Sequence, residues 1–285
     1  MSDFVITADT GADLNKYFKK KFDTHFVKFP CFLNEKPFDS TDHAAFYNGM
    51  RSGVAVSTSQ INTEEIRNFF EPFLKDGFDI VHVSFSSALS GSFSCCCAAR
   101  EALMERYPDR RISVIDSKAA ASGQGLLYAI ALQMQCDGKT FEEIVTWLEQ
   151  NVYHLHHLFT VDNLSYLQRG GRISKTTAVV GAVLGVKPLL LVDAEGRLQL
   201  YSKTRGRRRS LDTIVGDISD YLSDIENKFM FISHADCQED AEYCAKLIRK
   251  TYRCEVYIAD LVPVIGAHSG PGTVHIAFLG KRLDF

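Results

Sequence analysis

The segment IVHVSFSSALSGS, residues 80–92, decides the fold class of this chain. Its first part, residues 80–85, is rich in β-branched and aromatic residues and predicts a strand. The hydroxyl-rich turn that follows opens a helix predicted over residues 90–107, and a further strand is predicted over residues 112–116. Two strands joined through a helix of this length form a right-handed βαβ unit, in which the strands are parallel.

The same alternation extends from this segment through the first half of the chain. A strand is predicted at residues 4–8, and helical patterns separate most of the later strand-like runs. The other predicted elements are an extended region at 24–33 and helices at 42–51, 64–75, 125–136 and 141–151. Such alternation predicts a parallel sheet with helices on both faces, so residues 1–152 are predicted to form an N-terminal three-layer α/β/α domain.

A different pattern begins after residue 152. Residues 187–193 and 197–202 predict a hairpin that turns at residues 194–196. The remaining predicted elements are strands at 156–163, 229–233, 254–259 and 273–279 and helices at 174–184, 208–222 and 239–251. A hairpin combined with helices predicts a mixed sheet covered mainly on one face. Residues 153–285 are therefore predicted to form a C-terminal two-layer α/β domain.

Composition and charge exclude several classes of protein. The chain has 285 residues, of which 46% are hydrophobic and 24% charged, as expected for a globular protein of two domains. A net charge of −3 argues against nonspecific binding of nucleic acid, which needs a basic surface. The most apolar stretch, residues 178–192, is interrupted by Lys187 and Pro188, so no stable membrane insertion is expected. No secretory signal is recognisable, and we expect a cytoplasmic protein.

The cysteines and histidines do not have the spacing of a metal site. Three of the eight cysteines are consecutive, Cys95 to Cys97, and consecutive helical residues point in different directions. No CxxC spacing occurs, which favours free thiols in a reducing cytoplasm. His154, His156 and His157 have no cysteine or carboxylate at ligand spacing nearby, so no metal is predicted.

Common motifs for cofactor binding and catalysis are also incomplete or not recognisable in the sequence. Gly123-Gln-Gly125 lacks the third glycine of a dinucleotide-binding fingerprint. Neither a P-loop nor a GxSxG nucleophile elbow occurs. The sequence therefore predicts no cofactor and no catalytic residue.

Hydroxyl-bearing turns follow the strands of the predicted parallel sheet. They comprise residues 8–13, 57–60, 86–92 and 116–118. The carboxyl ends of parallel strands lie at one edge of a sheet, where ligands bind in open α/β folds. Hydroxyls and helix N-termini together suit a small anion or a carboxylate. Helix capping explains any one of these turns equally well, so both interpretations stay open.

Three segments of the second half contain further candidates. Residues 169–174 form a glycine-flanked basic turn, and residues 203–209 place five cations in seven residues. A solvated helix start explains Arg208 and Arg209. Residues 266–272 are predicted as a glycine-rich loop around one histidine. Glycines at such places let a backbone approach a ligand closely, which favours a functional role for this loop.

Five motifs thus follow one another along the chain. They are TSQ (58–60), SSALSGS (86–92), GGRIS (170–174), KTRG (203–206) and GAHSGPG (266–272). As an ordered set, they resemble the DegV family of bacterial fatty-acid-binding proteins over the whole chain. The resemblance implies a long-chain fatty acid in a tunnel between two α/β domains. It also implies a partner, a separate ATP-binding fatty acid kinase protein, because some members are the lipid-binding subunit of a two-component kinase.

Residue by residue, the resemblance implies a carboxylate site. The implied ligand-binding residues are Thr58, Ser59, Ser90, Gly91, Arg172, Arg205 and His268. The chain departs from the family in three places: Ala8-Asp9-Thr10 replaces TDS, Ile61 replaces the proline after TSQ, and Ser92 replaces the threonine of LSGT. These exchanges keep a hydroxyl or remove only a proline at a helix start. The apolar residues expected either to line the tunnel or to pack in the core are Ala178, Val179, Val180, Val183 and Leu184.

Two other classes of function stay open. The chain could be an enzyme, either a serine hydrolase that uses Ser90 or a phosphotransferase related to dihydroxyacetone kinases. No base for Ser90 and no nucleotide motif is recognisable, which argues against both. Alternatively, it is a regulatory protein in which a bound lipid only fills space.

Overall fold

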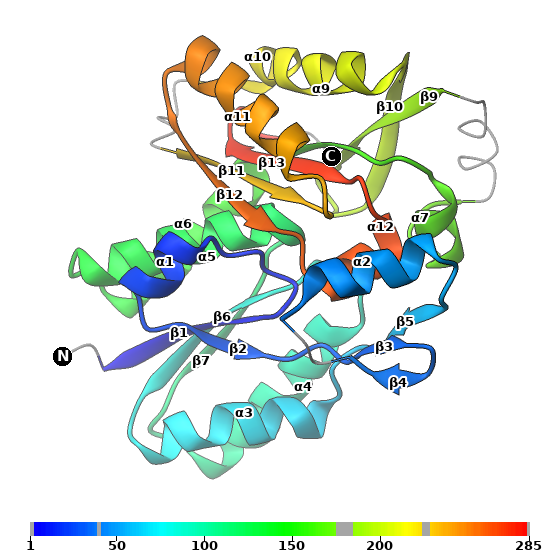
Figure 1. Cartoon of the computed structure of the whole chain (residues 1–285). Helices are drawn as coiled ribbons and strands as arrows, with labels where there is room; N and C mark the ends of the chain where they lie inside the picture. The colour runs from blue at the N-terminus through cyan, green and yellow to red at the C-terminus, as the bar shows by residue number, and fades with distance from the viewer. Residues whose placement is uncertain (1–2, 39–40, 175–184, 224–228, 284–285) are drawn as a thin grey trace.

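The computed structural model describes residues 3–38, 41–174, 185–223 and 229–283. Its first sheet contains β1 (Phe4–Asp9), β2 (His25–Val27), β6 (Asp79–Ser84) and β7 (Ile112–Asp116). The strand order is β2-β1-β6-β7, and all three pairings are parallel. The predicted parallel sheet is therefore confirmed (Figure 1).

Helices cover both faces of this sheet, as the alternation of elements predicts. Helices α3 (Thr63–Lys75) and α4 (Ser92–Arg106) pack on one face, and α5 (Ala121–Cys136) and α6 (Phe141–Asn151) on the other (Figure 1). The short helix α1 (Lys16–Lys21) follows β1. Both α3 and α6 begin with a capping box, in which the cap side chain and a glutamate three residues on satisfy backbone N–H groups.

A small antiparallel sheet, β4-β3-β5, lies beside the parallel one. Its strands are β3 (Cys31–Leu33), β4 (Lys36–Pro37) and β5 (Val56–Thr58), and α2 (His43–Arg51) lies between β4 and β5 in the chain. The prediction of one extended region at 24–33 is wrong, because its ends belong to two sheets. Pro30, which has no N–H to give to a ladder, lies in the break between them.

The second half forms the predicted mixed sheet. Its strands are β8 (Leu155–Thr160), β9 (Val186–Val192), β10 (Leu198–Arg205), β11 (Phe229–His234), β12 (Glu255–Asp260) and β13 (Val274–Leu279). The order is β10-β9-β8-β13-β11-β12, in which only β11 and β12 pair in parallel. Helices α9 (Arg207–Gly216), α10 (Ile218–Tyr221) and α11 (Gln238–Tyr252) cover its outer face (Figure 1). Most of the helix predicted at 174–184, residues 175–184, lies outside the described residues, and with it the apolar residues expected after Arg172.

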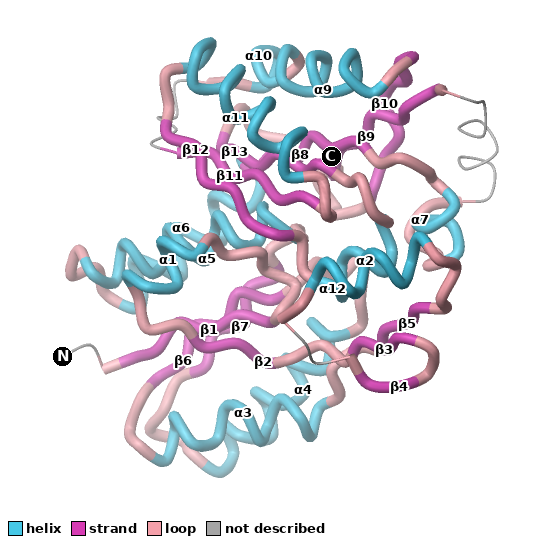
Figure 2. The backbone as a smooth tube through the Cα atoms, viewed as in Figure 1, coloured by secondary structure: helices cyan, strands magenta, loops and turns pink. Residues whose placement is uncertain are grey.

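Helix α5 is shared by the two sheets. It contacts β1 and β6 of the parallel sheet and β11 and β13 of the mixed sheet, so it lies between them (Figure 2). All residues from Ala121 to Ala129 are buried, as expected for a helix without a solvent face. Gly123 packs against the ring of His157, and Gly125 against the backbone carbonyl of Asp13. A side chain at either glycine would collide with these groups.

The glycine-rich segment 266–272 is partly helical, which corrects the prediction of a loop. Helix α12 (Pro263–Ser269) begins with a proline at its first position, where the missing N–H costs nothing. The positive φ angles of Gly270 and Gly272 then turn the chain toward β13. His268 therefore lies on the last turn of a helix.

Residue 152 begins a short 3-10 helix, Val152–His154, between α6 and β8. Every strand of the parallel and the small sheet precedes it, and every strand of the mixed sheet follows it. On this basis we propose the division into residues 1–152 and 153–285. Within the described residues, no helix combines the length and hydropathy needed to cross a membrane.

A substitution at Gly266 would test the packing of α12 against α2. A methyl group added there would overlap the ring of Tyr47, whose hydroxyl is fixed by donating to the Leu261 carbonyl. We expect Gly266→Ala to lower the free energy of unfolding by about 1–3 kcal/mol, the usual cost of overpacking. In the control, Gly216→Ala, the methyl group meets no atom within 4 Å, and stability should be unchanged or raised by up to about 1 kcal/mol. Equal midpoints of urea unfolding for the two variants would contradict this docking.

Candidate functional site

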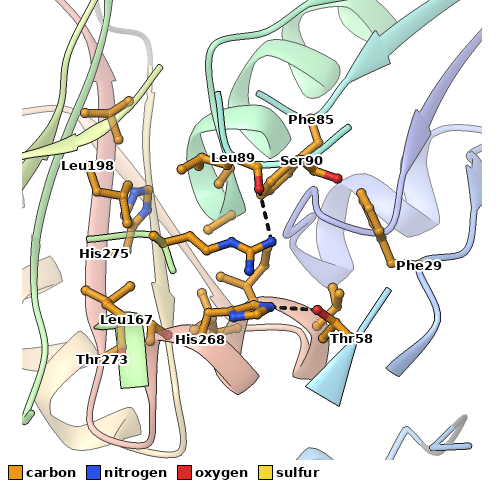
Figure 3. Close-up of a pocket in the computed structure, with 18 of the residues that line it drawn as sticks. Phe29, Thr58, Phe85, Leu89, Ser90, Leu167, Leu198, His268, Thr273 and His275 are labelled. Carbon is orange, nitrogen blue, oxygen red and sulfur yellow. Dashed lines mark hydrogen bonds between the residues drawn. The ribbon is translucent and has the colours of Figure 1, made fainter. Parts of the chain in front are cut away.

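A cavity of about 280 Å³ lies where the two sheets meet the start of α5 and the helix α12. Both halves of the chain line it (Figure 3). The first half contributes Thr58, Phe85 and Ser90, and the second contributes Leu198 and His268. The cavity is therefore complete only when the two halves are packed together.

A hydrogen bond between the halves marks the polar end of this cavity. Thr58, the last residue of β5, has its Oγ1 2.7 Å from Nε2 of His268 on α12 (Figure 3). Ser59 also lines the cavity, although its side chain is largely exposed. Two predicted site residues that are 210 positions apart in the chain are thus in direct contact.

The turn before α4 brings Ser90 and Gly91 to the same cavity. The Ser90 hydroxyl lies 3.0 Å from that of Ser92, which accepts a hydrogen bond from the backbone N–H of Ile61 at 3.1 Å. Gly91 is so close to Gln60 that a Cβ would overlap its side chain. Ile61 and Ser92, two of the departures from the family motifs, therefore contact each other, and a proline at 61 would lack the N–H that this contact uses.

Arg172 connects the halves at the cavity wall. It follows α7 (Ser165–Arg169), and its guanidinium donates to the carbonyl oxygens of Gly170 and, at 3.1 Å, of Leu89. Gly170 packs on the ring of His268 so closely that a Cβ would overlap Nδ1. Gly171 has a φ of +73°, which favours glycine. Gly170 thus leaves space for the His268 ring, and Gly171 allows the backbone to turn.

The charge of the lining is unbalanced. Burial, together with the smaller effect of the nearby Arg172 charge, lowers the pKa of His268 to about 4, so the imidazole is neutral at neutral pH. Burial also lowers the pKa of Arg172, which remains a cation. Among the described residues that line the cavity, Arg172 is the one formal charge and no carboxylate is present. The cavity therefore favours an anionic group at its polar end.

The rest of the wall is mostly apolar. It includes Phe29, Phe85, Phe159, Leu167, Leu198 and Val264. None of these residues was predicted from the sequence to line the site, because apolar residues at strand ends and in loops look the same whether they face a core or a ligand. The tip of the β9–β10 hairpin closes this region, where the Ser86 hydroxyl donates to the Gly196 carbonyl at 2.9 Å.

One predicted site residue lies elsewhere. Arg205 is exposed at the end of β10 and does not line the cavity. Arg207, its neighbour in the basic segment, donates to Asp240 at 2.8 Å in a different depression. The family resemblance implies Arg205 as a ligand-binding residue, but neither Arg205 nor Arg207 lines the cavity that contains His268.

Two buried carboxylates hold the turns around the cavity without lining it. Asp9 accepts hydrogen bonds from the backbone N–H groups of Gly11 and Phe85 and from the Gln124 amide. Asp13 accepts from the N–H of Val262, just before α12. Burial raises the pKa of Asp9 to about 6 and that of Asp13 to about 7. The hydrogen bonds of both residues hold backbone segments in place.

A serine hydrolase would need a base beside Ser90. In the part of the chain that the structure describes, the Ser90 hydroxyl contacts the hydroxyl and the N–H of Ser92 and no base. A serine–histidine pair does exist, with Ser122 Oγ 2.5 Å from Nδ1 of His275, but Ser122 is fully buried and does not line the cavity. Burial lowers the pKa of His275 to about 3, which makes it a poor base.

The junction histidines make hydrogen bonds within the protein. His154 and His156 lie within 3.0 Å of the carbonyl oxygens of Gly280 and Lys281. His157 Nδ1 lies 3.1 Å from Nε2 of His275. Across residues 3–38, 41–174, 185–223 and 229–283, no group of three or more metal-ligating side chains is present.

Comparison with known sequences gives one family. Residues 3–281 match the family model described as "Uncharacterised protein, DegV family". The chain is 42% identical to a DegV domain-containing protein of Clostridium perfringens over 290 aligned residues, which cover 100% of each chain.

Comparison with solved structures gives the same fold. A stearic-acid-binding protein of Eubacterium ventriosum is 26% identical, with a TM-score of 0.86 and 99% of each chain covered. The fatty acid kinase B3 protein of Streptococcus pneumoniae, solved with linoleic acid, is 21% identical with a TM-score of 0.85, covering 99% of this chain and 100% of that one. Both of these proteins bind fatty acids.

Proposed function

The chain belongs to the DegV family, and on that premise we propose that it binds one long-chain fatty acid in the cavity between its halves. We further propose that it presents the carboxylate to a separate ATP-binding kinase protein and has no catalytic activity alone. A cytoplasmic location, where such a kinase has access to ATP, belongs to the same proposal.

The observation that carries this proposal is the charge pattern of the lining. One arginine, neutral hydroxyls and a neutral histidine lie at one end, apolar side chains form most of the wall, and no carboxylate opposes an anion. The volume of about 280 Å³ is close to the lower end of ligand pockets, about 300–1,000 Å³, and suits one narrow ligand. A fatty acid has this polarity and this shape.

The tail and the head group of a fatty acid would contribute unequally to the binding free energy. About fifteen buried methylenes contribute on the order of 0.8 kcal/mol each, roughly 12 kcal/mol before ordering costs. Hydrogen bonds to a carboxylate add only about 1–3 kcal/mol after desolvation. The tail therefore provides most of the affinity, while the polar end fixes the orientation.

Thr58, Ser59, Ser90, Gly91, Arg172 and His268 form the proposed head-group site. Thr58 and Ser90 offer hydroxyl donors, and Arg172 offers the positive charge. We leave Arg205 out of this site because it is exposed at the end of β10. In our proposal, Arg205 instead contacts the docked kinase, which supplies ATP and metal.

The first prediction concerns occupancy. Protein purified after expression in bacteria should carry a fatty acid, because a buried alkyl chain dissociates slowly. Native mass spectrometry should show one added mass of roughly a C14 to C18 acid, the size range of common bacterial long-chain fatty acids. A spectrum without ligand, together with no binding of added oleate or palmitate, would refute the proposed function. That outcome would favour an enzyme or a regulatory protein.

The second prediction concerns the head group. Thr58→Val and Ser90→Ala should each weaken fatty acid binding by about 1–2 kcal/mol, or five- to thirty-fold, because each removes one hydrogen bond to the carboxylate. The control is Ser57→Ala, since Ser57 is exposed and alternates to the other face of β5. Titration with a fluorescent fatty acid measures all three. Unchanged affinity in the Thr58→Val/Ser90→Ala double variant would place the carboxylate elsewhere.

The third prediction concerns presentation. The purified chain with labelled ATP, magnesium and oleic acid should form acyl phosphate only when the candidate kinase from the same cell is added. Arg205→Ala should reduce this product severalfold while fatty acid affinity stays unchanged. Lys250→Ala removes an equally exposed cation from the end of α11 and serves as control. Acyl phosphate formed by this chain alone would contradict the presenter role.

A further inference from the structure

Asp13 joins the two halves of the chain beside the cavity without lining it. It follows β1 in the first half, and its Oδ1 accepts a hydrogen bond from the N–H of Val262 at 2.9 Å. Val262 is the residue before α12, which contributes Val264, Ile265 and His268 to the lining of the cavity. The position of α12, and with it that of the proposed head-group residue His268, therefore depends on a contact with Asp13.

The backbone of Asp13 holds a second wall of the cavity. Its N–H donates to the carbonyl of Ala121, at the start of α5, at 3.1 Å. A Cβ at Gly125 of the same helix would overlap the carbonyl oxygen of Asp13, so the helix and this residue are in close contact. Ala120 and Ala121 line the cavity. Asp13 thus fixes the start of α5 relative to the start of α12.

The surroundings of the Asp13 side chain are poorly suited to a charge. The residue is 1% exposed, and its Oδ2 has no hydrogen-bond partner among the described residues. Of the elements around it, α1 contributes the exposed Lys19, the end of β12 contributes Asp260, and α2 contributes the neutral phenol of Tyr47. The start of α5 and the residue before α12 contribute backbone groups.

Ionisation of Asp13 therefore disfavours the packed position of α12. Burial raises the pKa of Asp13 to about 7, although the hydrogen bond from Val262 acts in the opposite direction. The cost of the buried charge disappears when α12 moves away and water reaches the carboxylate. The packed state is thus stabilised most when Asp13 is protonated, and this contribution is lost as the pH rises from the ordinary value of 3.8 toward 7.

We propose that Asp13 is a positioning residue whose protonation holds α12 against the start of α5, so that retention of the fatty acid depends on pH. The inference rests on the proposed function, since it names a regulation of that same site. Protonated Asp13 keeps both walls of the cavity in place. Ionised Asp13 loosens α12 and speeds release of the ligand, which Asp13 itself does not touch.

The test follows release of a fluorescent fatty acid by stopped flow at about pH 5 and about pH 7.5. Wild type should release the acid roughly tenfold more slowly at the lower pH, the factor that corresponds to one pKa unit between two states. Asp13→Asn keeps an oxygen that accepts from Val262 but cannot ionise, so it should release slowly at both pH values. It shares every other titrating group with wild type, including the carboxyl of the ligand, so the difference between the two proteins reports Asp13 alone.

A matched control and a variant on the other side of the hydrogen bond complete the test. Asp9→Asn alters the second buried carboxyl, whose hydrogen-bond donors all lie in the first half, so it should keep the pH dependence of wild type. Val262→Pro removes the N–H that Asp13 accepts, and the φ angle of −63° at Val262 already suits proline. This variant should release the acid rapidly at both pH values.

The remaining outcomes separate the inference from the function on which it rests. Equal release rates of wild type at the two pH values, or equal pH dependence in wild type and Asp13→Asn, overturn the inference and leave fatty acid binding intact. Binding of no fatty acid by wild type refutes the proposed function itself. If Asp13→Asn does not fold, Val262→Pro decides, and a pH dependence equal to that of wild type in this variant overturns the inference.

Discussion

Complete burial of the first nine residues of α5, Ala121 to Ala129, is the constraint on which the rest of the structure depends. The parallel sheet packs on one side of this part of the helix and the mixed sheet on the other, so it has no face for polar side chains in water. Its polar residues must find partners inside the protein: Gln124 donates to Asp9 and to the Val83 carbonyl, and Ser122 contacts His275. The helix therefore fixes the distance between the sheets and ties each of them to it by hydrogen bonds.

The cavity is a consequence of this arrangement. It opens at the start of α5, where Ala120 and Ala121 are too small to fill the space between the sheets. Buried carboxylates hold the surrounding turns, although burial raises the pKa of Asp9 to about 6 and that of Asp13 to about 7. Carboxyls with raised pKa values stabilise the fold most when protonated, and this contribution is lost as pH rises from their unfolded values toward 6 and 7. The hydrogen bond from the Phe85 N–H to Asp9 positions Phe85, and the hydrogen bond from the Val262 N–H to Asp13 positions the start of α12.

The polar end of the cavity brings together polar side chains from distant parts of the chain. Thr58 and His268 form one contact, Ser90 is positioned through Ser92 and Ile61, and Arg172 donates to carbonyls of both halves. Burial keeps His268 neutral. These groups suit the proposed role, in which the site holds and orients a carboxylate for a partner.

The sequence by itself determined the two kinds of sheet, most helices and the turns with Thr58, Ser90, Arg172 and His268, because periodicity, caps and glycines are local signals. It did not determine the split of residues 24–33 between two sheets, the helical form of 263–269 or the exposure of Arg205. Nor could it identify the apolar wall or the contact between Asp13 and Val262. Those properties depend on which residues meet across α5, and only the tertiary structure decides such long-range contacts.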